Sequence, residues 1–208
     1  MRRNDYLCNS NELVLSALFK ESIGYLGITD SLGFPRPVPL QFVESNGRIY
    51  FHGANSGEKY TAFLQKQLLS FSLVKELSMI PSYWRAKGYA CPATSYYLSA
   101  YGTATGKLIT ESDEKAKYLQ LLMEKYQPEG RFTEISPEIK MYKEPLEETA
   151  VFEMKISSWN IKCKVGQNMN RKAFQNILDK LRERGTKIDL ETLWWMKQIT
   201  RPTSSGKK

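Results

Sequence analysis

The stretch from Arg36 to Lys59 reads RPVPLQFVESNGRIYFHGANSGEK, and its pattern decides the fold. Two apolar runs, Val38 to Val43 and Arg48 to His52, flank an Asn-Gly pair. Such a pair supplies the positive backbone φ angles that a tight turn between two antiparallel strands needs. We therefore predict a β-hairpin, with its turn at Ser45-Asn46-Gly47.

The second predicted strand runs into a loop of small residues, Gly53 to Gly57, and Lys59 follows this loop. Small residues leave backbone amides uncovered, and lysine adds a positive charge that contacts phosphate without strict geometry. An ordinary solvated lysine is the alternative reading. The spacing differs from the GxxxxGK[ST] pattern of a P-loop. The loop is a candidate anion site, and a helix predicted over Ser56 to Gln67 would begin beside it.

The order of these parts suits a flat heterocycle that carries a phosphate tail. A strand presents backbone groups, a histidine ends its hairpin partner, and a small-residue turn follows. From Gly24 to Lys59 the chain resembles the flavin-binding split-barrel proteins related to pyridoxamine 5'-phosphate oxidase, especially their nitroimidazole-resistance-like branch. The matching pattern is a strand, a Gly-containing turn, a Pro-x-Pro strand and Tyr-Phe-His-Gly-Ala-x-x-Gly-x-Lys at 50–59. Lys-x-Gly-Gln-Asn at 164–168 is similar to the PaiB-like branch.

The resemblance covers most of Gly24 to Asn168, and it implies the fold and the assembly. The fold is mainly β with flanking helices: an FMN-binding split β-barrel over residues 1–168. A helical C-terminal extension, 169–208, would pack on the barrel or on a dimer partner. Two copies would form a homodimer with FMN at the interface, held by both chains.

The resemblance also implies the site residues. His52 is the candidate catalytic residue, near the flavin, although a satisfied histidine at a strand end is the alternative. In the family, a later strand commonly bears a Tyr-Arg-Ser triplet that reaches the flavin phosphate of the neighbouring subunit. This chain has Tyr96, Tyr97 and Ser99 there, without the arginine. The candidate cofactor-binding residues are Val38, Pro39, Leu40, Gln41, His52, Gly53, Ala54, Gly57, Lys59, Tyr97 and Ser99.

The function implied by the resemblance is that of an FMN-dependent oxidoreductase of the pyridoxamine 5'-phosphate oxidase-like or nitroreductase-like type. Hydride or electrons would pass through the flavin N5. The alternative is a flavin-binding transcriptional regulator of the PaiB-like type, without turnover. A haem-handling variant is the weakest option because the chain has one histidine. The sequence names no substrate, and a deazaflavin could replace FMN.

Composition narrows the remaining classes. The net charge of +8 leaves nucleic acid binding open, but the basic residues are scattered and no helix-turn-helix with a basic recognition face is evident. The three cysteines are far apart, and with a single histidine they predict no metal site and a reducing, cytoplasmic environment. No apolar run approaches the length of a membrane span, so we expect no membrane partner.

Periodicity and turn residues predict the other elements. Gly24 and Gly27 would be costly within their strand unless another backbone or a ligand approaches it closely. Asp189 is predicted to cap the last helix, which carries Trp194 and Trp195. These tryptophans pack in a core or dimer interface, or one of them covers the flavin. The predicted strands are Ile23–Thr29, Leu69–Val74, Ser95–Ile109 and Thr149–Ile156 with an extension to Val165, and the predicted helices start near Leu13, Glu111, Arg171 and Asp189.

Overall fold

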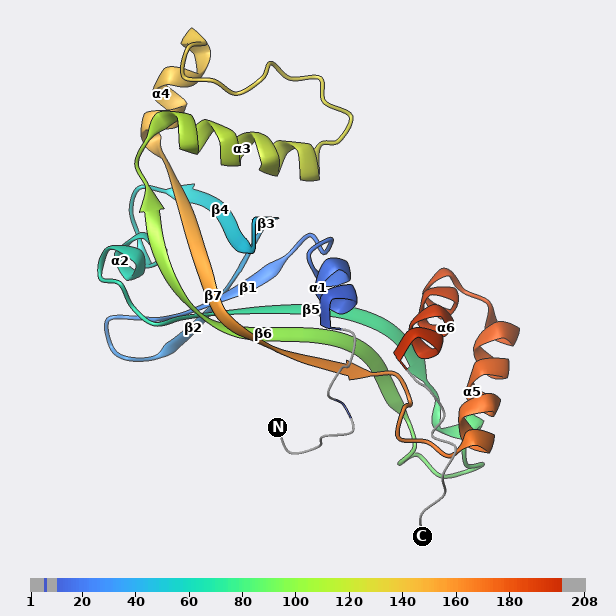
Figure 1. The fold of residues 1–208 in the computed structure, drawn as a ribbon. Helices are drawn as coiled ribbons and strands as arrows, with labels where there is room; N and C mark the ends of the chain where they lie inside the picture. Colours follow the sequence, from blue (N-terminus) through green and yellow to red (C-terminus); the bar gives the residue numbers. More distant parts are fainter. Residues whose placement is uncertain (1–5, 7–10, 200–208) are drawn as a thin grey trace. The chain divides into compact units, whose positions relative to one another are not determined.

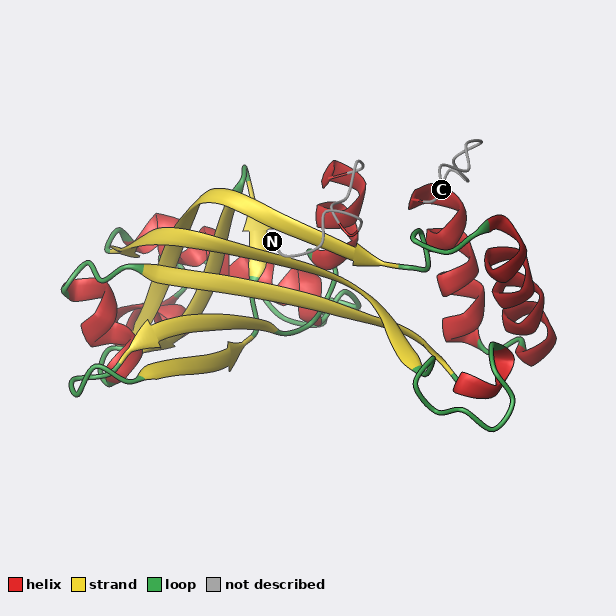
Figure 2. Ribbon diagram, turned by 90° about the horizontal axis from the view of Figure 1, so that it is seen from below, coloured by secondary structure: helices red, strands yellow, loops and turns green. Residues whose placement is uncertain are grey.

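The structure is a computed structural model that describes residue 6 and residues 11–199. Within these ranges seven strands form one antiparallel sheet, in the order β2-β1-β5-β6-β7-β4-β3, with helices beside it (Figures 1 and 2). The mainly β fold with flanking helices is therefore confirmed. The strands are β1 (Gly24–Thr29), β2 (Pro35–Leu40), β3 (Val43–Ser45), β4 (Arg48–Ala54), β5 (Leu69–Ile80), β6 (Thr94–Ile109) and β7 (Thr149–Lys164). The helices are α1 (Asn11–Leu18), α2 (Glu58–Leu64), α3 (Ser112–Tyr126), α4 (Lys140–Glu148), α5 (Arg171–Arg184) and α6 (Lys187–Ile199), with a 3-10 turn, η2 (Ser82–Trp84).

The chain forms two compact units. Unit 2 comprises Phe19–Leu73 and Tyr101–Asn160, and unit 1 holds 11–18, Val74–Ala100 and 161–199 among the described residues. Strands β5, β6 and β7 each contribute residues to both units. The domain boundary predicted after residue 168 lies inside unit 1, so α5 and α6 share a unit with parts of these strands.

The Asn-Gly turn is confirmed, but its first strand is shorter than predicted. Ser45 of β3 pairs with Arg48 of β4. Between them Asn46 and Gly47 have φ angles of 52° and 74°, as a two-residue hairpin turn of this type requires. The prediction that residues 38–40 belong to this hairpin was wrong, because they lie in β2 and pair with β1.

A two-residue crossover closes the sheet of unit 2. Gln41 and Phe42 connect β2 to β3, which stand at opposite ends of the strand order. The three Cα steps from Leu40 to Val43 span at most about 11 Å, whereas seven flat strands would hold the outer two about 29 Å apart. The sheet must therefore curl until β2 and β3 approach each other, which makes unit 2 a barrel. Phe42 is fully buried beside the crossover.

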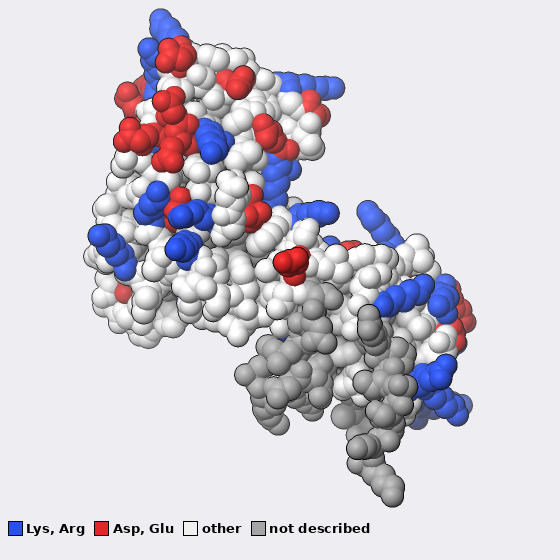
Figure 3. Space-filling model, viewed as in Figure 1, with Lys and Arg blue, Asp and Glu red and all other residues white. Residues whose placement is uncertain are grey.

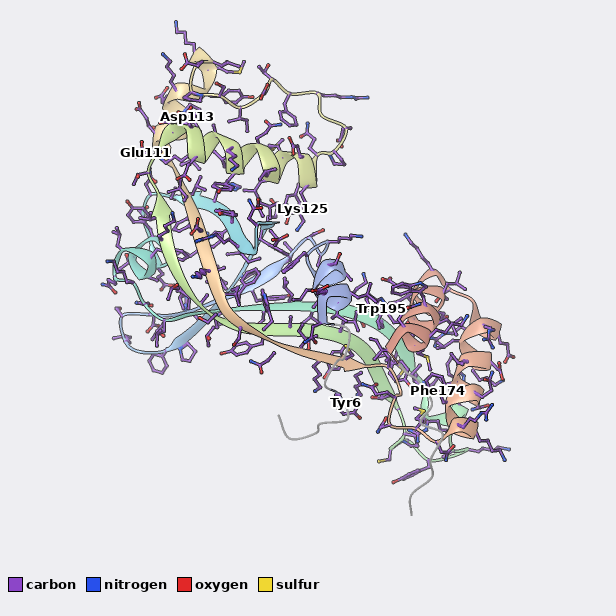
Figure 4. All side chains as sticks on the ribbon, viewed as in Figure 1. Tyr6, Glu111, Asp113, Lys125, Phe174 and Trp195 are labelled. Carbon is purple, nitrogen blue, oxygen red and sulfur yellow. The ribbon has the colours of Figure 1, made fainter. Side chains whose placement is uncertain are left out.

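The end of α3 holds this crossover in place. The Lys125 ammonium projects from the last turn of α3 (Figure 4) and donates to the backbone carbonyls of Phe19, Glu21 and Phe42, at 3.0, 2.9 and 2.9 Å. Burial lowers the pKa of Lys125 to about 8. The hydroxyl of Tyr126 accepts a hydrogen bond from the backbone N–H of Phe42 at 2.9 Å. Lys125 and Tyr126, both at the end of α3, thus give hydrogen-bond partners to the backbone C=O and N–H of Phe42.

Side chains, and not the expected backbone or ligand, approach the glycines of β1 closely. A Cβ atom at Gly24 would lie 2.2 Å from Cζ of Phe71, and one at Gly27 would lie 2.2 Å from Oγ of Ser70. Helix α4 was not predicted, since Leu146 is its one buried residue and Pro145 interrupts its pattern.

Asp189 does not cap α6, contrary to the prediction. Thr186 does so: its hydroxyl accepts from the backbone N–H of Asp189 at 3.3 Å, and Asp189 Oδ2 accepts from the Thr186 N–H at 3.1 Å, which is the reciprocal pattern of a capping box. Asp189 is fully buried and also accepts from Ser78 Oγ and from two nitrogens of Arg184. The Arg184 guanidinium holds the pKa of this carboxyl far below its ordinary range.

We expect Asp189→Asn to lower the free energy of unfolding by about 3 kcal/mol, because it leaves Arg184 without its buried partner. Asp179→Asn, which breaks an exposed pair with Arg182 at 2.6 Å, should cost less than about 1 kcal/mol. Urea unfolding at pH 7 measures the free energy of unfolding of both variants. Equal losses of stability would show that the Asp189 pair stabilises the fold no more than an exposed pair does. Because the folded pKa is depressed, the stability from Asp189 is present above the unfolded pKa of about 4 and is lost as the pH falls below it.

A second variant tests the crossover. Tyr126→Phe should lower the free energy of unfolding by about 1–2 kcal/mol, because the N–H of Phe42 loses its acceptor. Tyr142→Phe is the matched control, since the Tyr142 hydroxyl donates to the Thr133 carbonyl at an exposed position. Thermal or urea unfolding of both variants gives the comparison, and a Tyr126 loss no larger than the control would show that the crossover does not need this bond.

Candidate functional site

The candidate site is a cavity of about 580 Å³ in unit 2, lined by residues 35–39 of β2 and 56–59 at the start of α2. This volume lies in the range of small-molecule sites. The cavity unites four predicted residues, Val38, Pro39, Gly57 and Lys59. Two segments that are separated in the sequence by the crossover, β2 and the start of α2, therefore line the same cavity.

Lys59 supplies the positive charge of this site. Its side chain passes over Gly53 of β4, where an added Cβ would lie 3.0 Å from the Lys59 Nζ atom. The Nζ atom also lies 5.9 Å from the centre of the Phe51 ring. Among the described residues no carboxylate lies within 4 Å of it, and burial lowers its pKa. Lys59 is therefore a half-buried cation without an ionic partner in the part of the chain that the structure describes.

The loop before Lys59 has a fixed conformation. Asn55 Nδ2 donates to the carbonyl of Glu147 at 2.9 Å. Gly57 has a φ angle of 89°, in the region that favours glycine, and it precedes α2 directly. Because α2 has only seven residues, the charge of Lys59, and not the end of the helix, dominates the local electrostatics.

His52 lies next to this charge. It occupies β4 opposite Val151 of β7, and its side chain reaches solvent. Partial burial, and then the positive charge of Lys59, lower the pKa of the imidazole below its ordinary value. His52 is consequently neutral at pH 7, so one ring nitrogen can accept a hydrogen bond or a proton while the other donates.

Strand β2 gives the cavity an edge of acceptors. Pro35, Pro37 and Pro39 alternate along it and pair with β1. Since proline has no N–H, these residues occupy the positions whose backbone points away from β1. At these positions of an antiparallel pair the carbonyls also point away from β1, so a ligand that contacts this edge would donate hydrogen bonds to it.

The structure does not place the other predicted residues on the cavity wall. Leu40 is buried, while Gln41 and Ala54 are exposed. Tyr97 and Ser99 lie on the part of β6 that belongs to unit 1. Their role in cofactor binding stays a prediction.

Two lysines accompany Tyr97 in unit 1. The Nζ atoms of Lys162 and Lys164 lie 5.3 and 5.8 Å from the centre of its ring, and Lys164 also donates to the hydroxyl of Thr94. Alternate lysines on a strand usually mark a solvated face. Here both are half-buried and bring positive charge beside the tyrosine.

The tandem tryptophans differ from each other. Trp195, labelled on α6 in Figure 4, is 2% exposed and packs inside unit 1, and its ring lies edge-on to Trp194 at 4.7 Å. Trp194 is 45% exposed. Packing therefore explains Trp195, and the role of Trp194 stays open.

Sequence reasoning missed an ion pair at the cavity. Arg36 Nε lies 3.3 Å from Glu58 Oε2, and both residues line the cavity wall. The sequence held two signals for this pair: an arginine between two prolines of β2, and a glutamate directly before Lys59. Only the fold brings the two residues together.

The sequence also raised metal, membrane and nucleic-acid sites. Within the described residues no group of three His, Cys, Asp or Glu side chains could hold a metal ion. None of the helices in the described part of the chain is both long and apolar enough to cross a bilayer. On the face drawn in Figure 3, basic and acidic side chains are interspersed, so this face shows no continuous basic surface.

The sequence of residues 10–162 matches the family described as pyridoxamine 5'-phosphate oxidase. No curated protein sequence matches the chain.

Solved structures share the fold, at low sequence identity. The flavocytochrome Anf3 from Azotobacter vinelandii has a TM-score of 0.65 and 19% identity, over 81% of this chain and 75% of that one. The FAD and heme binding protein from Mycobacterium smegmatis has a TM-score of 0.62 and 17% identity, over 85% of this chain and 80% of that one. A proposed 5-nitroimidazole antibiotic resistance protein from Bacteroides thetaiotaomicron has a TM-score of 0.60 and 19% identity, over 75% of this chain and 85% of that one. These likenesses confirm the split-barrel fold.

The environment of His52 yields a prediction. Because the charge of Lys59 lowers the pKa of His52, Lys59→Met should raise this pKa. Lys155→Met, which removes an exposed lysine of β7 that does not line the cavity, should leave it unchanged. The chain has a single histidine, so a proton NMR titration of untagged protein reads the pKa directly. Equal His52 pKa values in the wild type and both variants would show that the charge of Lys59 does not act on His52.

Proposed function

This chain belongs to the pyridoxamine 5'-phosphate oxidase family, and on that premise we propose that it is an FMN-binding oxidoreductase. The flavin phosphate contacts Lys59, and the ring lies along β2 and near His52. The observation that carries the proposal is the half-buried Lys59 without a carboxylate partner among the described residues, beside a cavity of flavin size. The flavin and FAD named for two of the structural neighbours support the choice of cofactor class.

The residues present fit such a group. Gly53 leaves the space that Lys59 occupies, so the ammonium lies against β4, where a phosphate at the cavity wall can reach it. The outward carbonyls of Pro37 and Pro39 accept hydrogen bonds, which suits the N–H of a flavin ring. His52 is neutral and adds no charge to the site.

A bound flavin would supply hydride or electron transfer through its N5 atom. The residues of the chain supply binding and orientation. Lys59 neutralises one phosphate charge, β2 fixes the polar edge of the ring, and His52 can hold or return a proton at its free ring nitrogen. This division of labour requires no carboxylate pair or catalytic triad.

We also propose that two copies form a homodimer in which each flavin contacts both chains. The resemblance assigns Tyr97 and Ser99 to the flavin of the second copy. Lys162 and Lys164, beside Tyr97, supply the positive charge that the missing arginine would have provided. Sedimentation of the flavin-loaded protein at twice the mass of the chain supports this assembly, and the mass of one chain contradicts it.

FMN binding tests the proposal. After incubation with FMN and desalting, the wild-type protein should keep the visible bands of a bound flavin. Lys59→Met should weaken binding by about tenfold to a hundredfold, because it removes a charge-assisted contact to the phosphate. Riboflavin, which has no phosphate, should bind wild type and Lys59→Met equally.

Lys155→Met is the control, and it should bind FMN as the wild type does. A wild-type protein that stays colourless would overturn the proposal. Flavin that binds equally well to Lys59→Met would place the phosphate elsewhere. Loaded protein whose flavin neither accepts electrons from NAD(P)H nor passes them to quinones or nitroaromatic compounds would favour the regulator without turnover.

A further inference from the structure

Arg36 and Glu58 form an ion pair on the wall of the cavity that Lys59 also lines. Arg36 comes from β2 and Glu58 from the first turn of α2, and the Arg36 Nε atom lies 3.3 Å from Glu58 Oε2. Both side chains are 53% exposed, so neither is needed for the core. An exposed pair of this kind contributes little stability, which directs attention to its effect on the charge of the cavity.

The charges on the cavity wall can be counted from its residues. Arg36 and Lys59 are cations and Glu58 is an anion. They leave one net positive charge. Glu58 also pairs with the guanidinium of Arg36, so Arg36 is less available to a ligand than Lys59 is.

We propose that Glu58 sets the charge specificity of this site: it weakens the binding of a phosphate with two negative charges, such as that of FMN, relative to a phosphate with one. The inference rests on the proposed function, that the cavity takes a flavin phosphate. FMN still binds through Lys59, but less tightly than it would without the carboxylate of Glu58.

The physical reason is that the second charge of a phosphomonoester meets a carboxylate. Within the cavity Glu58 repels each phosphate charge while Lys59 attracts it. Removal of Glu58 would end this repulsion and release Arg36, which raises the net charge to two. A doubly charged ligand gains from both changes more than a singly charged ligand does.

Two flavins that share one ring system serve as probes. FMN carries two phosphate charges at pH 8, because its second pKa lies near 6 as in other phosphomonoesters. Riboflavin 4',5'-cyclic phosphate is a diester with one charge. Quenching of flavin fluorescence at low salt gives the Kd of each, and the ratio of the two Kd values cancels the contribution of the ring.

Glu58→Gln should tighten FMN binding relative to the cyclic phosphate by about three- to thirtyfold, as expected for charges several ångströms apart in a partly solvated site. Glu138→Gln is the matched control. It removes the same charge from an exposed position outside the cavity, and it should leave the ratio of Kd values at its wild-type level.

The double variant Arg36→Gln with Glu58→Gln separates charge from shape. It returns the net charge of the cavity to one, so the ratio should return to that of the wild type. A ratio that stays as in Glu58→Gln would overturn the inference.

The outcomes distinguish this inference from the proposed function. If FMN binds and Lys59→Met weakens it, but Glu58→Gln changes the ratio no more than Glu138→Gln, only the role of Glu58 is wrong. If neither flavin binds to any of these proteins, the proposed function fails and the inference fails with it.

Discussion

The barrel of unit 2 depends on the two-residue crossover at Gln41 and Phe42. Because this link is too short to span an open sheet of seven strands, β2 and β3 must meet. Burial of Phe42 and the bonds from Lys125 and Tyr126 compensate the backbone that the crossover takes out of the sheet. The candidate site follows from this closure, since one wall of the cavity comes from β2, before the crossover, and the other from the start of α2, after it.

Within that frame the chemistry of the site is electrostatic. Gly53 gives Lys59 room to lie against β4, and this position places a positive charge beside His52. Partial burial and this charge together lower the pKa of the imidazole. Glu58 and Arg36 balance each other on the cavity wall. Within the described residues the wall therefore combines a cation without a carboxylate partner and an edge of carbonyl acceptors, and the neutral imidazole of His52 lies near that cation. A cofactor with an anionic tail and an N–H edge is complementary to this arrangement.

Local signals predicted the parts of the fold that depend on backbone conformation. The Asn46-Gly47 turn is an example, because positive φ angles restrict the residue choice strongly. Pairing beyond the turn was not predictable in the same way: residues 38–40 looked like the hairpin partner of β4, but the prolines of β2 suit a strand at the end of the sheet order. Helix α4 lacks an apolar stripe, and Thr186 competed with Asp189 as a cap. Of the residues that the resemblance assigned, Val38, Pro39, Gly57 and Lys59 line the cavity, whereas the ion pair of Arg36 and Glu58 needed the fold.

The most direct test is the pKa of the single histidine, measured by NMR with and without saturating FMN. If the flavin phosphate binds at Lys59, it neutralises the charge that depresses this pKa, and the His52 titration moves to higher pH when FMN is present. Riboflavin, without phosphate, should produce less of this shift. FMN that binds and leaves the His52 pKa where it was, or shifts it no more than riboflavin does, would contradict a phosphate site at Lys59.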